Sequence, residues 1–196
     1  MSEAITVRPA QRSDASEIAL LTNIAVHGGL SQRWAADEAA KDTYDPVEIG
    51  RLAALAEEAP FTWRDASIAE HDGEVVGMLM GYREPDAAEP LPGDLEPFLL
   101  PIYQLEAEAA GYWYVAMLGV HFKWRGKGIG SRLLDVAETK AAETGARGLA
   151  LISEDVNTGA VRLYERRGFR VRAKRKMVRF PGGGPKGEDW LLMVKD

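Results

Sequence analysis

The heptapeptide Arg125-Gly126-Lys127-Gly128-Ile129-Gly130-Ser131 narrows the fold and function of this 196-residue chain more than any other stretch. Its three alternating glycines let the backbone come close to a ligand, because no side chain screens the amides at those positions. A buried strand is predicted over 112–120, before the heptapeptide, and a helix over 131–144, after it. The unpaired N–H groups and the positive dipole end of that helix therefore point at the same place. With the charges of Arg125 and Lys127, the pattern predicts a site for a phosphate or pyrophosphate.

Other glycine-rich nucleotide motifs fit this loop less well. In a Walker A loop, His121 would stand at the first glycine and Gly128 at the hydroxyl residue after the lysine. A dinucleotide-binding fingerprint would place its third glycine at Ser131 or Leu133. An S-adenosylmethionine-dependent methyltransferase is the alternative, because the alternating glycines match and Glu154-Asp155 is available for a ribose. That fold usually continues with several more parallel strands, and a basic loop suits phosphates better than a sulfonium.

Strand and helix patterns alternate on both sides of the loop. Strands or hairpins are predicted over 5–8, 66–82, 148–152 and 169–194, the last turning at 181–185. Helices are predicted from Ser13 to Ala25, which Gly28-Gly29 ends, from Pro46 to about Leu55, and over 157–167. The order predicts one α/β (α+β) domain over 1–196, with a mixed, twisted central sheet flanked by helices and a C-terminal β-hairpin.

Residues 84–111 differ in composition from the rest of the chain. They contain five prolines and seven acidic residues but no lysine or arginine, and a short helix is predicted within 101–110. This segment is either a flap or insertion of the domain or a solvated acidic surface loop. If it borders the active site, its charge would favour a cationic acceptor.

Composition excludes several classes of protein. The formal net charge is −6 and there is no cysteine, so disulfides, thiolate nucleophiles and Cys-ligated metals are absent. The charge argues against a nucleic-acid partner, and no apolar run is long enough to cross a membrane. The acidic start lacks the apolar segment of a signal peptide, so a cytoplasmic location is expected. The three histidines are scattered, and no metal site is predicted.

Two motifs resemble the GNAT N-acetyltransferase superfamily. Its Arg/Gln-x-x-Gly-x-Gly/Ala motif matches residues 125–130, and the strand end Leu118-Gly119-Val120 precedes it. Its Asn-x-x-Ala-x-x-x-Tyr-x-x-x-Gly-Phe motif matches Asn157, Ala160, Tyr164, Gly168 and Phe169. The resemblance covers nearly the whole chain, while the flap at 84–111 and the tail loop look individual.

The resemblance implies an N-acetyltransferase that uses acetyl-CoA and a small-molecule or peptide amine. Backbone groups of Leu118 and Val120 would pair with the pantetheine arm, Asn157 would lie near it, and Tyr164 would lie beside the thioester sulfur. The pyrophosphate would be held by Arg125, Gly126, Lys127, Gly128, Ile129, Gly130 and Ser131.

The chemistry of such a transfer assigns further roles. A neutral amine attacks the thioester carbonyl, and the N–H of Gly119 or Val120 would stabilise the oxyanion. The Tyr164 phenol would give the departing thiolate a proton, although packing in the core is the competing role for this residue.

One departure from the family pattern concerns the base. Many members carry a glutamate on the strand before the glycine loop, whereas residues 112–120 contain no acid. Glu154, Asp155, a flap acid or a water path could replace it. The missing acid also keeps a catalytically silent acyl-CoA sensor as an alternative.

Three further points stay open from the sequence. Arg170, Arg172, Lys174 and Lys176 alternate along one predicted strand, where they would either meet the ribose phosphate or protect a sheet edge. The acceptor amine is not specified, because one fold serves many acceptors. The oligomeric state, a homodimer included, is equally open.

Overall fold

The computed structural model describes residues 5–36, 45–57, 61–180 and 183–196. The acidic start of the chain and the first two residues of the predicted 181–185 turn lie outside these ranges. The elements in chain order are β1 (Thr6–Pro9), η1 (Arg12–Asp14), α1 (Ala15–Ala25), α2 (Gly29–Ala36), α3 (Pro46–Leu55), η3 (Trp63–Asp65), β2 (Ala66–His71), β3 (Glu74–Arg83), α4 (Leu100–Ala107), β4 (Trp113–Val120), η4 (Phe122–Trp124), α5 (Ile129–Glu143), β5 (Leu149–Glu154), α6 (Thr158–Arg166), β6 (Arg170–Lys176) and β7 (Asp189–Lys195).

The strands hydrogen-bond in the order β1-β2-β3-β4-β5-β7-β6. β4 and β5 pair parallel, whereas β1–β2, β2–β3, β5–β7 and β6–β7 pair antiparallel. The predicted mixed sheet with flanking helices and a C-terminal hairpin is therefore confirmed. The chain groups into two compact units, one of residues 1–81, 117–136 and 181–184 and one of 82–116, 137–180 and 185–196.

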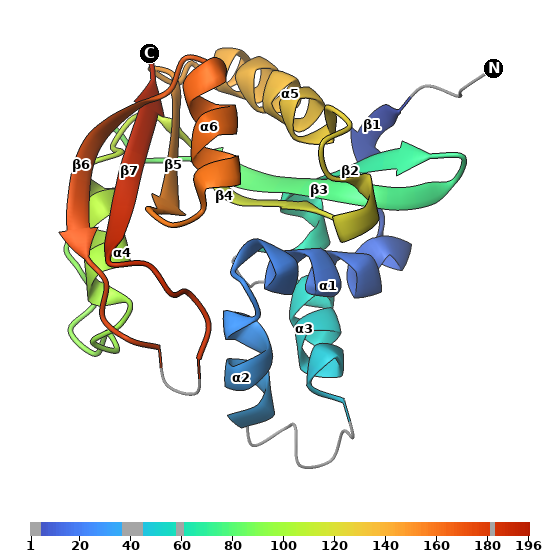
Figure 1. Ribbon diagram of the computed structural model, residues 1–196, viewed down its shortest axis with the longest axis horizontal. Coiled ribbons are helices and arrows are strands. Elements are labelled where there is room, and N and C mark those ends of the chain that lie inside the picture. Colours follow the sequence, from blue (N-terminus) through green and yellow to red (C-terminus); the bar gives the residue numbers. More distant parts are fainter. Residues whose placement is uncertain (1–4, 37–44, 58–60, 181–182) are drawn as a thin grey trace. The chain divides into compact units, whose positions relative to one another are not determined.

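The core of the first unit lies between α1, α3 and the strands β2 and β3. Figure 1 shows α1 and α3 on the same side of these strands. The side chains packed there are fully buried on both the helix and the strand side, namely Ile18, Leu21, Ile68, Met78 and Met80. Burial of each such side chain stabilises the fold by about 1.5–3 kcal/mol.

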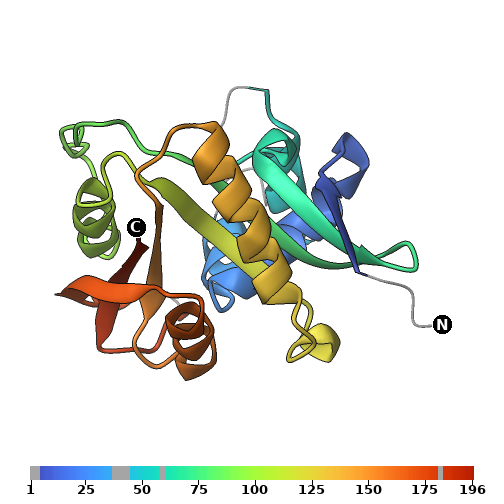
Figure 2. The same cartoon turned by 90° about the horizontal axis from the view of Figure 1, so that it is seen from above.

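Two glycines let helices approach the strands of the first unit on opposite faces (Figures 1 and 2). A β-carbon at Gly77 of β3 would lie 3.1 Å from the Ile129 side chain of α5. A β-carbon at Gly119 of β4 would lie only 2.5 Å from the Leu21 carbonyl of α1. The first turn of α5 is thereby held close to β3, and this contact positions the loop that precedes it.

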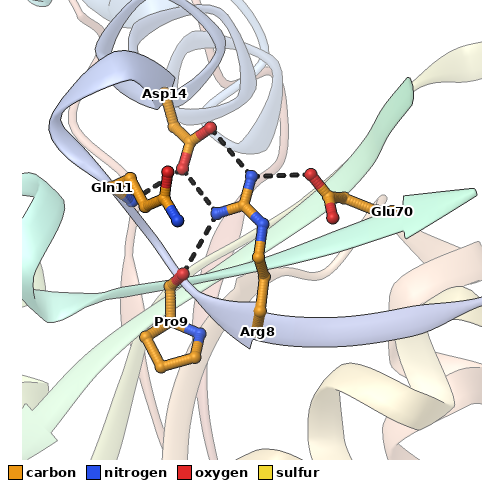
Figure 3. Close-up of polar contacts among 5 residues, drawn as sticks. All are labelled: Arg8, Pro9, Gln11, Asp14 and Glu70. Carbon is orange, nitrogen blue, oxygen red and sulfur yellow. Dashed lines mark hydrogen bonds and ion pairs between the residues drawn. The ribbon is translucent and has the colours of Figure 1, made fainter. Parts of the chain in front are cut away.

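An arginine joins three segments near the start of the chain (Figure 3). The guanidinium of Arg8 in β1 makes two hydrogen bonds to Asp14, at 2.7 and 3.0 Å, and one of 2.6 Å to Glu70 of β2. The Asp14 carboxylate also accepts the Gln11 amide at 2.7 Å and is buried. The contact with Arg8 lowers the pKa of Asp14.

The second unit packs helices on both faces of β5 and β7. Figures 1 and 2 show α4 on one side of these strands and α6 on the other. The α4 side contains Leu105, Ala109, Ala150, Leu192 and Val194, all buried.

The predicted basic strand lies at the edge of the sheet. β6 is the last strand in the order and pairs with β7. Its charges meet acids of the same unit: Arg170 contacts Asp196, Lys174 lies 3.6 Å from Asp189, and Lys176 lies 3.2 Å from Asp189. These contacts support the edge-protecting role over the phosphate-binding one.

Two boundaries differ from the sequence-based expectation. α1 ends at Ala25, and His27 and Gly28 follow it with positive φ values of 52° and 83°, but α2 begins directly after Gly28 and was not predicted. The reason is tertiary, because the indole of Trp34 in α2 lies against Gly50 of α3, where a β-carbon would be 2.5 Å away. α5 begins at Ile129, two residues earlier than predicted, because Ile129 is buried against β3.

Candidate functional site

Two glycines shape the loop between β4 and α5. Gly126 and Gly128 have φ values of 75° and 83°, in the left-handed region that favours glycine. No atom of the described chain lies within 4 Å of a β-carbon built at either position. The loop is thus an exposed, open turn, and its glycines serve backbone conformation and access.

The backbone amides of this loop are unused within the described residues. None of the amides of residues 126–131 donates to another group of that part of the chain. The first helical bond of α5 runs from the Arg132 amide to the Gly128 carbonyl, at 3.1 Å. Six consecutive donors at the positive end of a helix form an anion-binding arrangement.

The positive side chains of Arg125 and Lys127 are also available to an anionic ligand. In the described chain neither Arg125 nor Lys127 forms an ion pair, and both side chains are exposed. Arg125 Nε donates to the Val120 carbonyl at 3.3 Å, and Lys127 Nζ lies 4.3 Å from the centre of the Trp124 ring. Aromatic contact orients these cations without neutralising them.

The end of β4 leads directly into the loop. Leu118 and Val120 are half-buried and Gly119 is buried. The register with β5 runs from Trp113 only as far as Val115, so the last residues of β4 lie beyond it.

The second predicted motif lies on α6, in the other unit. Asn157 is the N-cap of this helix, and its side-chain oxygen accepts the Ala160 amide at 3.4 Å. Tyr164 lies two turns later, with 8% of its surface exposed, and its ring centre is 5.7 Å from that of Phe169. Burial raises the pKa of Tyr164 to about 12. Within the described residues its hydroxyl has no hydrogen-bond partner.

A comparison with protein families fits this arrangement. Residues 30–169, which include both motifs, match the model of the acetyltransferase (GNAT) family. The chain belongs to the GNAT acetyltransferase family.

Individual GNAT relatives agree with this membership. Acetyltransferase Atu2258 of Agrobacterium fabrum is 31% identical over 134 residues, which are 67% of this chain and 76% of that protein. N-alpha-acetyltransferase MAK3 of Arabidopsis thaliana is 45% identical over 62 residues, so the match spans only 32% of each chain. The structure of Arabidopsis thaliana Naa50 with the bisubstrate analogue CoA-Ac-MVNAL shares the fold, with a TM-score of 0.58, 14% identity and 99% coverage of both chains.

The two acids at the end of β5, Glu154 and Asp155, hold the segment before β7 of this GNAT chain. Glu154 is 5% exposed and its carboxylate accepts the Lys186 amide at 3.3 Å. Asp155 accepts the Glu188 amide at 3.1 Å. Both carboxylates therefore fix the segment before β7, a structural use that competes with the role of a base.

A polar cluster that the sequence did not predict lies at the base of the flap. Glu84 follows β3, Glu106 lies on α4, and Tyr82 and Tyr114 lie on β3 and β4. The Tyr82 hydroxyl donates a short hydrogen bond to Glu106. The sequence signal was weak: an acid, Glu84, directly after a strand that carries Tyr82 near its end.

The described residues contain neither a metal site nor a membrane-spanning helix. Among the described residues, no group of three or more His, Asp or Glu side chains is arranged to hold a metal ion. No described helix combines the length and apolar character needed to cross a membrane.

Proposed function

We propose that this GNAT chain is an acetyl-CoA-dependent N-acetyltransferase that acetylates a primary amine by direct attack. The observation that carries the proposal is the row of six amides at residues 126–131, which donate to no group of the described residues. Arg125 precedes this row and Lys127 lies within it, and neither forms an ion pair in the described part of the chain. A pyrophosphate needs many convergent donors, and this loop offers them without a side chain in the way.

In this proposal the residues of the first unit bind the cofactor. The loop from Arg125 to Ser131 holds the pyrophosphate, and the backbone of Leu118 and Val120 pairs with the pantetheine arm. The N–H of Gly119 or Val120 donates to the oxyanion that forms when the amine attacks.

Tyr164 acts on the leaving group in this proposal. Its pKa of about 12 means that the phenol keeps its proton at neutral and moderately alkaline pH. Complete transfer to a thiolate, whose pKa is ordinarily about 8.5, would be uphill. The hydroxyl therefore acts first as a hydrogen-bond donor that stabilises the departing sulfur, and its lack of a protein partner supports this use.

Asn157 has a double use in the proposal. Its side-chain oxygen already caps α6, so the amide NH₂ is the group that would face the pantetheine. The cap orients this amide before the ligand binds.

The acceptor class is part of the proposal. The relatives include an N-alpha-acetyltransferase, and the Naa50 complex contains a peptide in its analogue. These names support a peptide α-amine as a candidate acceptor beside cationic small molecules.

Two measurements on the full chain test the proposal. Calorimetric titration should give binding heat with acetyl-CoA and with coenzyme A, and none with S-adenosylmethionine. Release of free thiol should then depend on an added amine, tested with the peptide Met-Val-Asn-Ala-Leu, spermidine and kanamycin.

The alternatives predict other outcomes. Binding of acetyl-CoA without thiol release by any amine would indicate an acyl-CoA sensor. Heat with S-adenosylmethionine alone would indicate a methyltransferase and contradict the proposal.

A further inference from the structure

The cluster at the base of the flap contains two carboxylates and two phenols, all from residues 82–116 of the second unit. They come from the end of β3, the residue after it, α4 and β4. Tyr82 and Tyr114 meet edge to face, with ring centres 5.8 Å apart. Tyr82 donates to Glu106, and both carboxylates influence Tyr114 electrostatically. The four side chains thus form one polar site beneath the flap.

Burial and like charge act together on the carboxyl pair. Burial first, and then the charge of Glu106, raise the pKa of Glu84 to about 7. Burial raises the pKa of both Tyr82 and Tyr114 above the ordinary value, so the phenols keep their protons. Near neutral pH the group that exchanges a proton is therefore the Glu84–Glu106 pair.

Three further groups lie around the cluster. Glu89 of the flap raises the pKa of Glu84, and Tyr103 of α4 raises the pKa of Tyr114. Arg83 is the last residue of β3. Arg83 donates to the Glu84 main-chain carbonyl at 3.0 Å and to Asp86 at 2.6 Å. The Arg83 guanidinium thus bonds the main chain and Asp86, and not the Glu84 or Glu106 carboxylate.

Two polar atoms of the cluster lack partners within the described residues. Oε1 of Glu84 is buried without a hydrogen bond. Tyr114 is 6% exposed, and its hydroxyl has no partner in the described chain. Buried polar atoms are nearly always satisfied, so the unpartnered Oε1 of Glu84 indicates a ligand or water that supplies the missing bond. The Tyr114 hydroxyl is not fully enclosed and is free to bond the same ligand.

The position along the sheet fits such a ligand. Tyr114 pairs in register with Ala150, one residue before the last β4–β5 pair, Val115–Leu151. The cluster therefore adjoins the point where the two parallel strands stop pairing. In open α/β sheets, ligands bind where neighbouring strands separate.

Other acids are less suited to accept a proton. Glu154 and Asp155 hold main-chain amides of the tail, as described above. Of the flap acids, Asp86 pairs with Arg83 and Glu108 pairs with Arg175, each at 2.6 Å.

We propose that the Glu84–Glu106 pair, oriented by Tyr82, takes the proton from the ammonium group of the acceptor, while the Tyr114 hydroxyl hydrogen-bonds that nitrogen. The inference rests on the proposed acetyl transfer. An N–H bond of the ammonium breaks, an O–H bond forms on Glu84, and the electron pair stays on nitrogen as the nucleophile. Attack forms the C–N bond and breaks the C–S bond. The second proton of the nitrogen goes to the thiolate, and Glu84 returns its own proton to water.

This assignment selects an acceptor class. An α-amine has a pKa of about 7.7–8.0 and a lysine-type amine about 10.4. A base that titrates near neutrality takes the proton from an α-amine at a small free-energy cost and from a lysine-type amine at a larger one. Peptides with a free N terminus should therefore be preferred over polyamines.

The test follows kcat/KM across pH at saturating acetyl-CoA, with Met-Val-Asn-Ala-Leu as acceptor. The wild-type rate should rise with pH and be half-maximal near 7. Glu84→Gln should lose about 10²-fold at neutral pH, and the loss should shrink as pH approaches the pKa of the amine. Asp94→Asn, an exposed flap acid outside the cluster, should keep the wild-type profile.

Two further variants separate proton transfer from a structural role. Glu106→Gln removes the like charge and should move the midpoint to lower pH. Tyr82→Phe removes a hydrogen bond that lowers the pKa of Glu84, so the midpoint should move to higher pH. If Glu84→Gln does not fold, the opposite shifts of the pH midpoint in Glu106→Gln and Tyr82→Phe test the inference in its place. Midpoints equal to that of the wild type in both variants would overturn it.

The failures of the two proposals are distinguishable. A wild-type profile in folded Glu84→Gln, with acetyl-CoA binding intact, overturns this inference and leaves the acetyl transfer standing. A wild-type chain that neither binds acetyl-CoA nor releases thiol overturns both.

Discussion

At the scale of single residues, burial determines what the hydroxyl of the motif residue Tyr164 can do. A phenol with a pKa of about 12 and no partner in the described chain contributes little to folding through its hydroxyl. Removing an unpaired buried hydroxyl is nearly neutral for stability. Packing against Phe169 accounts for the ring, and the proposed function gives the hydroxyl its role on the leaving group.

Tyr164→Phe should therefore separate catalysis from stability. We expect kcat to fall by about 10²-fold while the acetyl-CoA Kd and the melting temperature stay unchanged. Because the pKa lies near 12, the wild-type rate should show no alkaline decline from this group below that pH. A variant with wild-type kcat, measured where chemistry is rate-limiting, would assign Tyr164 to packing alone.

Gly128 can be tested against a matched glycine. Gly128 and Gly145 have φ values of 83° and 65°, and each has open space where a β-carbon would lie. Replacement by valine should destabilise both variants by about 1–2 kcal/mol through the left-handed backbone. Only Gly128→Val should also weaken acetyl-CoA binding, as titration calorimetry would measure. Equal affinity in the two folded variants would make the loop purely structural.

At the scale of elements, the Arg8 contacts join β1 and β2 to the start of α1. Arg8→Met keeps the stem of the side chain but leaves the buried Asp14 without its partner. We expect a loss of about 1–3 kcal/mol in the free energy of unfolding at neutral pH.

The pH dependence of this variant has a definite sign. The folded pKa of Asp14 lies below its ordinary value of 3.8, so the contact stabilises above that value and is lost as pH falls through the folded pKa. Denaturant unfolding of both proteins should thus show a difference at neutral pH that shrinks below 3.8. A difference that stays constant on acidification would contradict an electrostatic origin.

Most elements could be predicted from the sequence because their signals are local. The Asp45 N-cap with Pro46 after it, the Asp72-Gly73 turn and the alternating glycines each determine the backbone within a few residues. α2 could not be predicted, since it depends on the contact between Trp34 and Gly50.

The candidate site likewise has one part that the sequence predicts and one part that it does not. The loop at 125–131 is contiguous, so sequence was enough to find it. The Glu84–Glu106–Tyr114 cluster was not found, because it joins three elements and its chemistry arises from burial. The seven flap acids looked equivalent in sequence, whereas the structure gives them different partners.

At the scale of the whole molecule, we expect the net charge and the acidic flap at 84–111 to set the electrostatic field that the proposed acceptor meets. The chain carries a formal charge of −6, and the exposed flap acids Glu89 and Asp94 form no ion pair within the described residues. We expect Glu89→Gln with Asp94→Asn to raise KM for spermidine and flatten its salt dependence, because the field that attracts cations is reduced.

The matched control removes the same charge elsewhere. Glu57→Gln with Glu143→Gln neutralises two exposed acids outside the flap. This variant should keep the wild-type KM and salt dependence, and acetyl-CoA affinity should be unchanged in both double variants. Equal effects of the two pairs would show that only the total charge matters.

The six amides of residues 126–131, which have no acceptor in the described part of the chain, have a consequence for how this protein tolerates mutation. Every amino acid except proline has a main-chain N–H donor. Most side-chain changes therefore keep the proposed hydrogen bonds from these amides to the pyrophosphate. In a saturation library of residues 126–131, Lys127 and Ser131 should accept most residues, Gly126 and Gly128 few because of their φ values, and Ile129 only apolar ones. Proline should be the substitution that survives least across the segment, because it alone deletes the donor while leaving the chain intact.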